Sequence, residues 1–168
     1  TTASTLLAPI MTPMMVLLLA GERINVPAAG MFISIIESVI LPVFLGFLLN
    51  YYFGRKESFQ DVREIMPSVA VIGLGLIVGG VISLQGAKFF SAGVVIFLAV
   101  FAHNGVGYLL GYTVGRLTGM SKAKKRTISI EVGMQNAGLA TGLAVAHFAI
   151  YPHAALAAAV SGAWHSIS

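Results

Sequence analysis

The chain has 168 residues, of which 57% are apolar and only 10% are charged, and its mean hydropathy is +0.90. An average soluble domain carries about 25% charged residues, so these charges are too few to cover the surface of a soluble globule. Intrinsic disorder is excluded too, because it requires low hydrophobicity and high charge. The remaining class is a protein of the lipid bilayer. Since a spanning helix takes about 20 residues, the length predicts roughly six spans.

The absence of cysteine excludes disulfide bonds, thiolate chemistry and cysteine-based metal sites. The formal net charge of +4 is typical of a membrane protein with basic cytoplasmic loops. The sequence has no basic stripe interleaved with aromatic residues, so we expect no nucleic-acid partner.

Six apolar segments predict six membrane helices. They are 1–20, 29–53, 65–84, 91–114, 126–150 and 152–168. The runs are too long and too uniformly apolar for the alternating strands of about ten residues that build membrane barrels, so we predict an all-α, polytopic fold. The chain opens and stops inside apolar segments, without an initiator methionine or a polar tail, which predicts a fragment.

The basic residues of the loops predict the orientation. The loops after the second and fourth segments hold Arg55, Lys56, Arg63, Arg116, Lys122, Lys124, Lys125 and Arg126, whereas those after the first and third hold Arg23 and Lys88. The positive-inside rule therefore places the loops around Arg55 and Lys124 in the cytoplasm.

The fifth apolar segment carries a cluster of polar residues and glycines. Glu131 lies about five residues inside its cytoplasmic end, where a charge costs on the order of 3 kcal/mol. Gln135 and Asn136 follow, bracketed by Gly133 and Gly138. This pattern predicts a break in the helix. Unwound backbone in a membrane is tolerated only where protein buries it or where it lines a cavity, and it exposes carbonyl oxygens to a bound ion or substrate.

The chemistry of this cluster indicates its ligand. One carboxylate, one side-chain amide and free carbonyl groups form an all-oxygen site with a single negative charge. Such a site suits a hard cation such as sodium, whereas transition metals favour imidazole or thiolate. The alternative is a structural ion pair between Glu131 and a basic residue of another helix.

Three further features have mainly structural interpretations. The stretch His103-Asn104-Gly105, deep in the fourth segment, either orients the broken helix through hydrogen bonds, packs or binds a ligand, and packing is favoured over ligand binding. Trp164 is a candidate interfacial anchor, and its neighbour His165, taken alone, is a hydrogen-bonded histidine of the bundle. The glycines of the third segment predict close helix packing, and the alternative is a hinge that lets one helix bundle move against another. These glycines are Gly73, Gly75, Gly79 and Gly80.

Residues 130–140, which read Ile-Glu-Val-Gly-Met-Gln-Asn-Ala-Gly-Leu-Ala, resemble the signature of the bile acid:sodium symporters in their bacterial branch. Three further stretches agree in order and spacing, so the resemblance covers the whole chain. They are Ser4-Thr5-Leu6 with Ala8-Pro9 and Thr12-Pro13, then 103–111, then 164–168.

The resemblance implies a fold of ten spans, built from two inverted five-helix repeats that form a core domain and a panel domain. The fourth and ninth helices of that fold are broken and cross near the midplane. This chain would run from the fifth span to the start of the tenth. Segment 1–20 and residues 91–168 would then belong to the core, with a discontinuous helix at 126–150 and a truncated last helix, and residues 29–84 to the panel. The partners of this chain would then include the N-terminal helices of the same transporter, which the chain lacks.

The resemblance also assigns ligands. Glu131 would be shared by two sodium ions, and Gln135 would add a side-chain oxygen to the second site beside the carbonyl groups of Val132 and Met134. Thr1 aligns with a ligand of the first site. Both sites would be incomplete in this fragment, because their other ligands lie before Thr1.

Asn136 and His165 resemble residues that face a bound organic anion. The implied function is not enzymatic. It is sodium-coupled symport by alternating access in the bacterial inner membrane, with a bile acid or a small carboxylate such as pantoate as the substrate. The alternatives are a proton-coupled transporter or cation/proton antiporter in which Glu131 titrates, and a structural membrane subunit.

Overall fold

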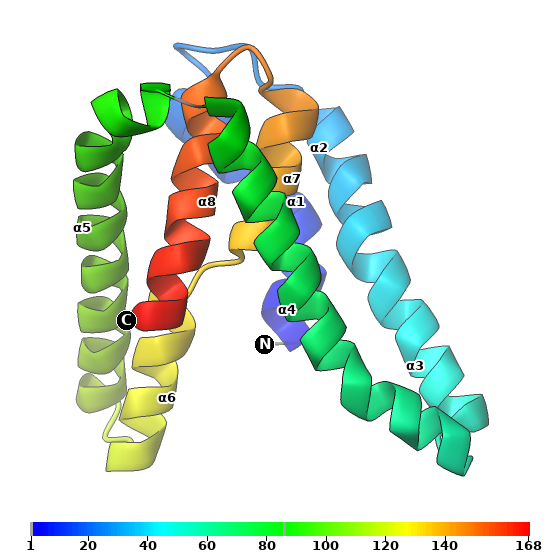
Figure 1. Cartoon of the computed structure of the whole chain (residues 1–168). Coiled ribbons are helices and arrows are strands. Elements are labelled where there is room, and N and C mark those ends of the chain that lie inside the picture. The colour runs from blue at the N-terminus through cyan, green and yellow to red at the C-terminus, as the bar shows by residue number, and fades with distance from the viewer. Residues whose placement is uncertain (1, 86) are drawn as a thin grey trace. The chain divides into compact units, whose positions relative to one another are not determined.

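A computed structural model describes residues 2–85 and 87–168, without the side chains of 2, 3, 84, 85, 87–92 and 152, so the predicted ligand Thr1 lies outside the described residues. The described part is helical, with short connections (Figure 1). The elements are α1 (Thr2–Ala20), α2 (Ala28–Ile35), the π-helical turn η1 (Ile36–Ile40), α3 (Leu41–Phe53), α4 (Glu57–Gln85), α5 (Ala87–Leu117), α6 (Lys122–Gly133), α7 (Ala137–His147) and α8 (Pro152–Ile167). These elements confirm the all-α prediction.

Three helical stretches among the described residues are long and apolar enough to cross a membrane. They are Ala28–Phe53, Glu57–Ser83 and Gly93–Leu117, and Ser4–Ala20 is a shorter apolar helix. Large apolar side chains on these helices are exposed, as Leu19 is to 76% and Val95 to 72%. A soluble monomer rarely exposes apolar surface of this extent, so the chain is a multi-pass membrane protein whose helices face lipid or other helices.

Several helix boundaries differ from the sequence prediction. Helix α6 begins at Lys122, so Lys122, Lys124 and Lys125 lie within it and not in the loop before it. Helix α4 begins at Glu57, so Arg63 lies within it and not in the preceding loop, which holds Arg55 and Lys56. Arg116 likewise lies in the last turn of α5. Charged residues with good helix propensity extend a helix beyond its apolar stretch. The shifts leave these residues near the same helix ends, and the orientation stays a prediction.

The chain forms two compact units, of which the first is Thr1–Leu76. Within it α1 packs against α2 and η1. The buried positions include Pro9 and Pro13 on α1 and Met31 and Ile35 on α2. Each pair is one turn apart on its helix, so the buried residues of each pair share one face.

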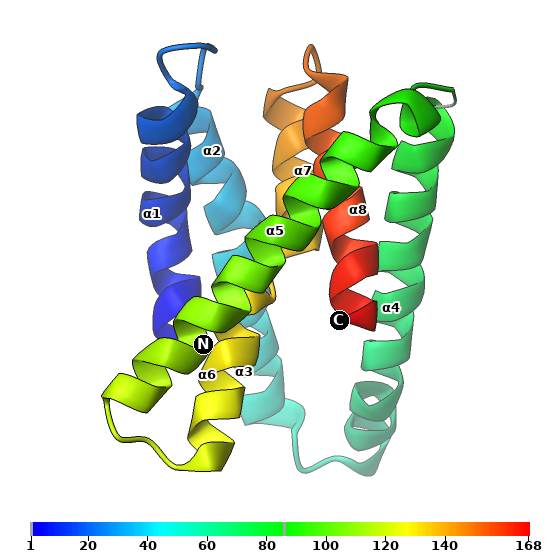
Figure 2. The ribbon, with the colours of Figure 1, turned by 90° about the vertical axis from the view of Figure 1, so that its left-hand side faces the viewer.

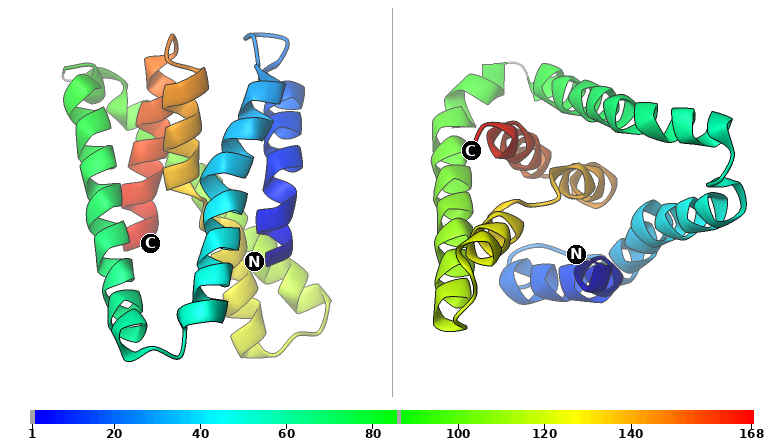
Figure 3. Two further views of the ribbon diagram at one scale, coloured as in Figure 1. Left: turned by 90° about the vertical axis from the view of Figure 1, so that its right-hand side faces the viewer. Right: turned by 90° about the horizontal axis from the view of Figure 1, so that it is seen from below.

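The second unit, Ile77–Ser168, holds the predicted helix break. Helix α5 packs along α6, and α8 packs against both α5 and α7 (Figure 2). A small core is formed by Val81 at the end of α4, Ala144 on α7, and Ala155 and Ala159 on α8. Figure 3 shows α6 and α7 joined by a short non-helical stretch of chain.

Candidate ion and substrate site at a broken helix

The predicted break is present between α6 and α7. Helix α6 ends at Gly133, and Met134 is extended, with φ −74° and ψ 130°. Helix α7 begins at Ala137, after Asn136 with φ −80° and ψ 79°. The helix break that the sequence predicts near Glu131–Gly138 is therefore confirmed.

Asn136 begins the second half-helix. Its Oδ1 accepts a hydrogen bond from the backbone N–H of Leu139 at 3.0 Å, which makes it the N-cap of α7. Asparagine is among the best N-cap residues, because its short side chain satisfies an N–H that has no partner within the helix. The residue is exposed, and its Nδ2 donates to no described acceptor.

Asn136→Ala should lower the free energy of unfolding by about 1 kcal/mol, the usual loss on removing such a cap. Asn136→Ser should retain most of the stability, because a serine hydroxyl also caps. Thermal unfolding of the two variants in detergent would show the difference. Equal melting temperatures would mean that the cap does not stabilise α7.

Glycines on α5 let the two helices α5 and α6 approach closely. A Cβ added to Gly107 would lie 2.9 Å from the Val132 oxygen, and one added to Gly111 would lie 2.7 Å from the Ile128 oxygen. A Cβ on Gly133 would overlap the ring of Tyr108. This contact was not predicted from the sequence, although G-x-x-x-G spacing is a known signal of close helix packing.

The glycines that were predicted to pack closely have no close neighbour among the described residues. A Cβ added to Gly73, Gly75, Gly79 or Gly80 would meet no atom within 4 Å among the described residues. Gly75 and Gly79 are also one turn apart, but no described neighbour lies against them, whereas Gly107 and Gly111 lie on the face of α5 that meets α6.

Asn104 connects α5 to the break and to α8. It is buried, with 1% of its surface exposed. Its Nδ2 donates to the carbonyl of Gly133 at 2.7 Å. Its Oδ1 accepts from Trp164 Nε1 at 3.0 Å and from Ser168 Oγ at 3.2 Å. The suggestion that this part of α5 orients the broken helix through hydrogen bonds is therefore confirmed for Asn104.

Trp164 is part of this contact and is not an isolated interfacial anchor. Its ring is half-buried, and it meets Phe97 edge-on with centroids 5.3 Å apart and Phe101 at 5.5 Å. The indole N–H is bonded to Asn104. A tryptophan that serves as an interfacial anchor instead directs its N–H towards the headgroups.

His165 lies on the other side of the extended residues. It is buried, and its Nδ1 accepts the backbone N–H of Gln135 at 3.4 Å. In the neutral ring Nε2 then carries the proton and donates it to Ser161 Oγ, 3.0 Å away. Both ring nitrogens are therefore bonded within the chain, as expected for a histidine of the bundle.

The break leaves some carbonyl groups without partners. The side-chain Nε2 of Gln135 donates to the carbonyl of Val132 at 2.9 Å. The carbonyl of Gly133 is taken by α5, as described above. The carbonyl groups of Glu131 and Met134 accept no hydrogen bond from the described residues. Oxygen atoms of this kind are ligands for a hard cation.

The Glu131 side chain is exposed in the last turn of α6. It is the one acidic residue of the sequence after position 76. No described residue forms an ion pair with it, so the structural ion pair considered as the alternative is not found in the described part of the chain. The described residues also bring together no group of three or more His, Cys, Asp or Glu side chains.

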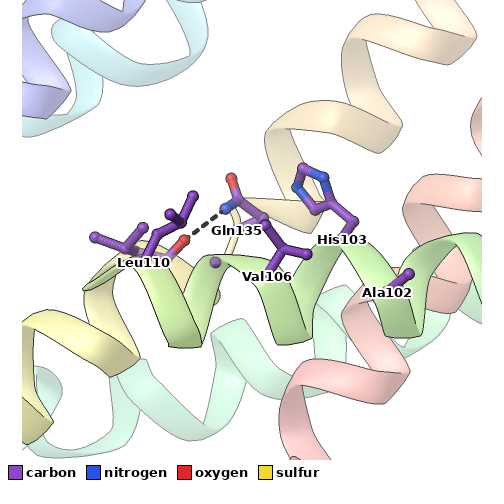
Figure 4. Close-up of a pocket in the computed structure, with 7 residues that line it drawn as sticks. Ala102, His103, Val106, Leu110 and Gln135 are labelled. Carbon is purple, nitrogen blue, oxygen red and sulfur yellow. Dashed lines mark hydrogen bonds between the residues drawn. The ribbon is translucent and has the colours of Figure 1, made fainter. Parts of the chain in front are cut away.

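A cavity of about 410 Å³ lies beside the break (Figure 4). Its lining is mostly apolar and consists of Ala102, His103, Val106, Gly107, Leu110, Val132 and Gln135. In Figure 4 the amide of Gln135 lies over α5 between Leu110 and His103, and the dashed line marks its bond to the Val132 carbonyl.

Comparison with known proteins identifies the family. The profile described as "Sodium Bile acid symporter family" matches residues 1–92. The chain belongs to this family. The break lies beyond the matched residues, but the relatives named below align with nearly the whole chain.

The "Uncharacterized sodium-dependent transporter YocS" of Bacillus subtilis (strain 168) is 41% identical over all 168 residues, which are 51% of its own length. The chloroplastic "Probable sodium/metabolite cotransporter BASS1" of Arabidopsis thaliana is 40% identical over 99% of this chain and 41% of its own length. The rice protein of the same name is 37% identical over 99% of this chain. The chain thus spans about half the length of YocS. These relatives are transporters, which agrees with the prediction that the chain is not an enzyme.

Proposed function

We propose that the chain is part of a sodium-coupled symporter of an organic anion. The observation that carries this proposal is the broken helix. At the break, the carbonyl groups of Glu131 and Met134 and the carboxylate of Glu131 have no partner among the described residues. A buried or lipid-facing structural helix has no need of such a break, whereas broken helices provide ion sites in secondary transporters.

For sodium we propose the Glu131 carboxylate, the side-chain oxygen of Gln135 and the carbonyl groups of Val132 and Met134 as ligands. Binding requires the Gln135 amide to leave the Val132 carbonyl, to which its Nε2 now donates, and to present its oxygen. Thr1 remains the proposed ligand of a first site that shares Glu131. Two sodium ions need further ligands, and we place those in helices that precede this chain in the complete transporter.

For the anion we propose Asn136 and His165 as contacts. The free Nδ2 of Asn136 lies at the N-terminus of α7, where backbone N–H groups and the helix dipole favour negative charge. A contact from His165 through Nε2 would replace its bond to Ser161. The apolar lining of the cavity beside Gln135 suits the hydrocarbon part of a bile acid or of a smaller carboxylate such as pantoate.

The transport cycle that we propose is alternating access in the bacterial inner membrane. A core formed by residues 1–20 and 91–168 would move against a panel formed by residues 29–84, within a ten-helix inverted repeat. Sodium must bind the two arrangements with different affinity for the ion gradient to drive this movement.

A sodium gradient should drive uptake by the complete transporter reconstituted in vesicles. Labelled pantoate or a bile acid should accumulate when sodium is high outside, and a sodium ionophore should abolish the accumulation. Accumulation that follows a pH gradient without sodium would instead support the proton-coupled alternative.

A second measurement, of protein stability, needs no substrate. Sodium, but not potassium, at 100 times its dissociation constant should stabilise the detergent-solubilised protein by about 2.7 kcal/mol. A structural subunit would show no ion effect.

A further inference from the structure

The carbonyl of Gly133 differs from its neighbours at the break, because a buried side chain occupies it. Asn104 Nδ2 lies 2.7 Å from this oxygen, whereas the carbonyl groups of Glu131 and Met134 have no partner among the described residues. Among the described residues, the Val132 carbonyl is held only by the exposed Gln135, which can turn away, whereas the Gly133 carbonyl is held by a buried side chain and stays out of reach of an ion. The choice of ion ligands at the break therefore depends on a side chain of α5.

The orientation of the Asn104 amide is fixed by its partners. An indole N–H can only donate and a backbone carbonyl can only accept, so Trp164 determines which end of the amide is Oδ1 and Gly133 determines which end is Nδ2. Ser168 Oγ donates to the same Oδ1 at 3.2 Å. Because the amide is 1% exposed, no water competes for these bonds, and a low dielectric strengthens them.

The surroundings hold this amide and the break in one arrangement. Tyr108 OH is 3.0 Å from Ser168 Oγ, and the backbone carbonyl of Tyr108 accepts from Ser129 Oγ of α6 at 2.8 Å. Gly107 allows the backbone of Val132 to lie against α5. The peptide group that follows Gly133 is thus fixed on the side of α5.

The fixed peptide group determines where the next carbonyl points. Met134 is extended, and in extended backbone successive carbonyl groups point to different sides. With the Gly133 carbonyl bonded to Asn104, the Met134 carbonyl is directed away from Asn104. The Gly133 carbonyl has a partner, whereas the Met134 carbonyl has none among the described residues.

We propose that Asn104 is a positioning residue for cation binding: it holds the Gly133 carbonyl and so presents the Met134 carbonyl to the ion. It makes no contact with the ion itself. This inference rests on the proposed sodium-coupled function.

The test compares Asn104→Leu with Thr141→Val in the complete transporter. Leucine has nearly the shape of asparagine without its hydrogen bonds. Thr141 is a matched control, because it is also 1% exposed and also donates to a backbone carbonyl, that of Ala137, at 2.7 Å. Both substitutions remove a buried side-chain bond of 2.7 Å to a backbone carbonyl, but only the first releases the Gly133 carbonyl. Asn104→Leu also removes the bonds that Asn104 Oδ1 accepts from Trp164 and Ser168.

The sodium concentration for half-maximal uptake should rise about tenfold or more in Asn104→Leu, the usual range when a residue that orients a metal ligand is removed. In Thr141→Val it should change less than about twofold. The sodium titration of melting temperature in detergent should shift by the same factors. If Asn104→Leu does not fold, Asn104→Ser, which also lacks the amide, gives the same comparison.

A half-maximal sodium concentration in Asn104→Leu equal to that of the unchanged protein would overturn the proposal. So would equal increases in the two variants, because they would indicate a general loss of stability. Failure of the proposed function has a different signature, since the unchanged protein itself would then show neither sodium-driven uptake nor a sodium-dependent melting temperature.

Discussion

Glu131→Gln should abolish sodium-driven uptake by the complete transporter. Glutamine keeps the shape of the side chain and removes its charge, which is the one negative charge of the sequence after position 76. Two unit charges 4 Å apart attract each other by about 4 kcal/mol at an effective dielectric constant of 20. Losing this attraction corresponds to roughly a thousandfold weaker ion binding, so uptake at ordinary sodium concentrations should fall to background.

Glu64→Gln is the control, because Glu64 is also an exposed glutamate but lies near the start of α4. It should transport normally. Wild-type-like sodium dependence in Glu131→Gln would exclude a central role for this carboxylate. If Glu131→Gln abolished uptake that a pH gradient drives in the unchanged protein, the proton-coupled alternative would gain support.

Gly111→Ala should destabilise the protein, whereas Gly105→Ala on the same helix should not. A Cβ at Gly111 would lie 2.7 Å from the Ile128 oxygen and 2.8 Å from Ser129 Cα, so the backbone of α6 would have to move. Overpacking of this kind costs typically 1–3 kcal/mol. A Cβ at Gly105 would meet no atom of the described residues within 4 Å, and alanine there should raise helix stability by up to about 1 kcal/mol.

Thermal unfolding in detergent would measure both effects, with helix content from circular dichroism as the check that each variant folds. The expected order of melting temperatures is Gly105→Ala, then the unchanged protein, then Gly111→Ala. Equal melting temperatures for the two variants would mean that α5 and α6 are not packed as closely as the structure shows.

The class of the protein and the location of the break could be predicted from the sequence, because both depend on local composition. Long apolar runs need no partner to be recognised as membrane helices. Gly133, Asn136 and Gly138 disfavour a continuous helix through their own backbone preferences and capping. The helix ends were predicted less accurately. Arg63, for example, lies within α4, which extends beyond its apolar stretch.

The sequence could not show which glycines lie against a neighbouring helix. Both Gly73–Gly80 and Gly107–Gly115 have small residues at helical spacing, yet only the second group meets a neighbouring backbone within the described residues. Which face of a helix meets another is decided by the rotation of both helices and not by either sequence stretch alone.

The sequence by itself determined that this is a polytopic membrane protein, that one helix is broken near Glu131, and that the polar residues Glu131, Gln135 and Asn136 lie together at that break. Only the tertiary structure decided that Asn104 holds the Gly133 carbonyl and that His165 holds the N–H of Gln135. The partners in these two bonds are 29 and 30 residues apart. Local preferences act within a turn or two of the chain, whereas bonds over this distance depend on how whole helices pack.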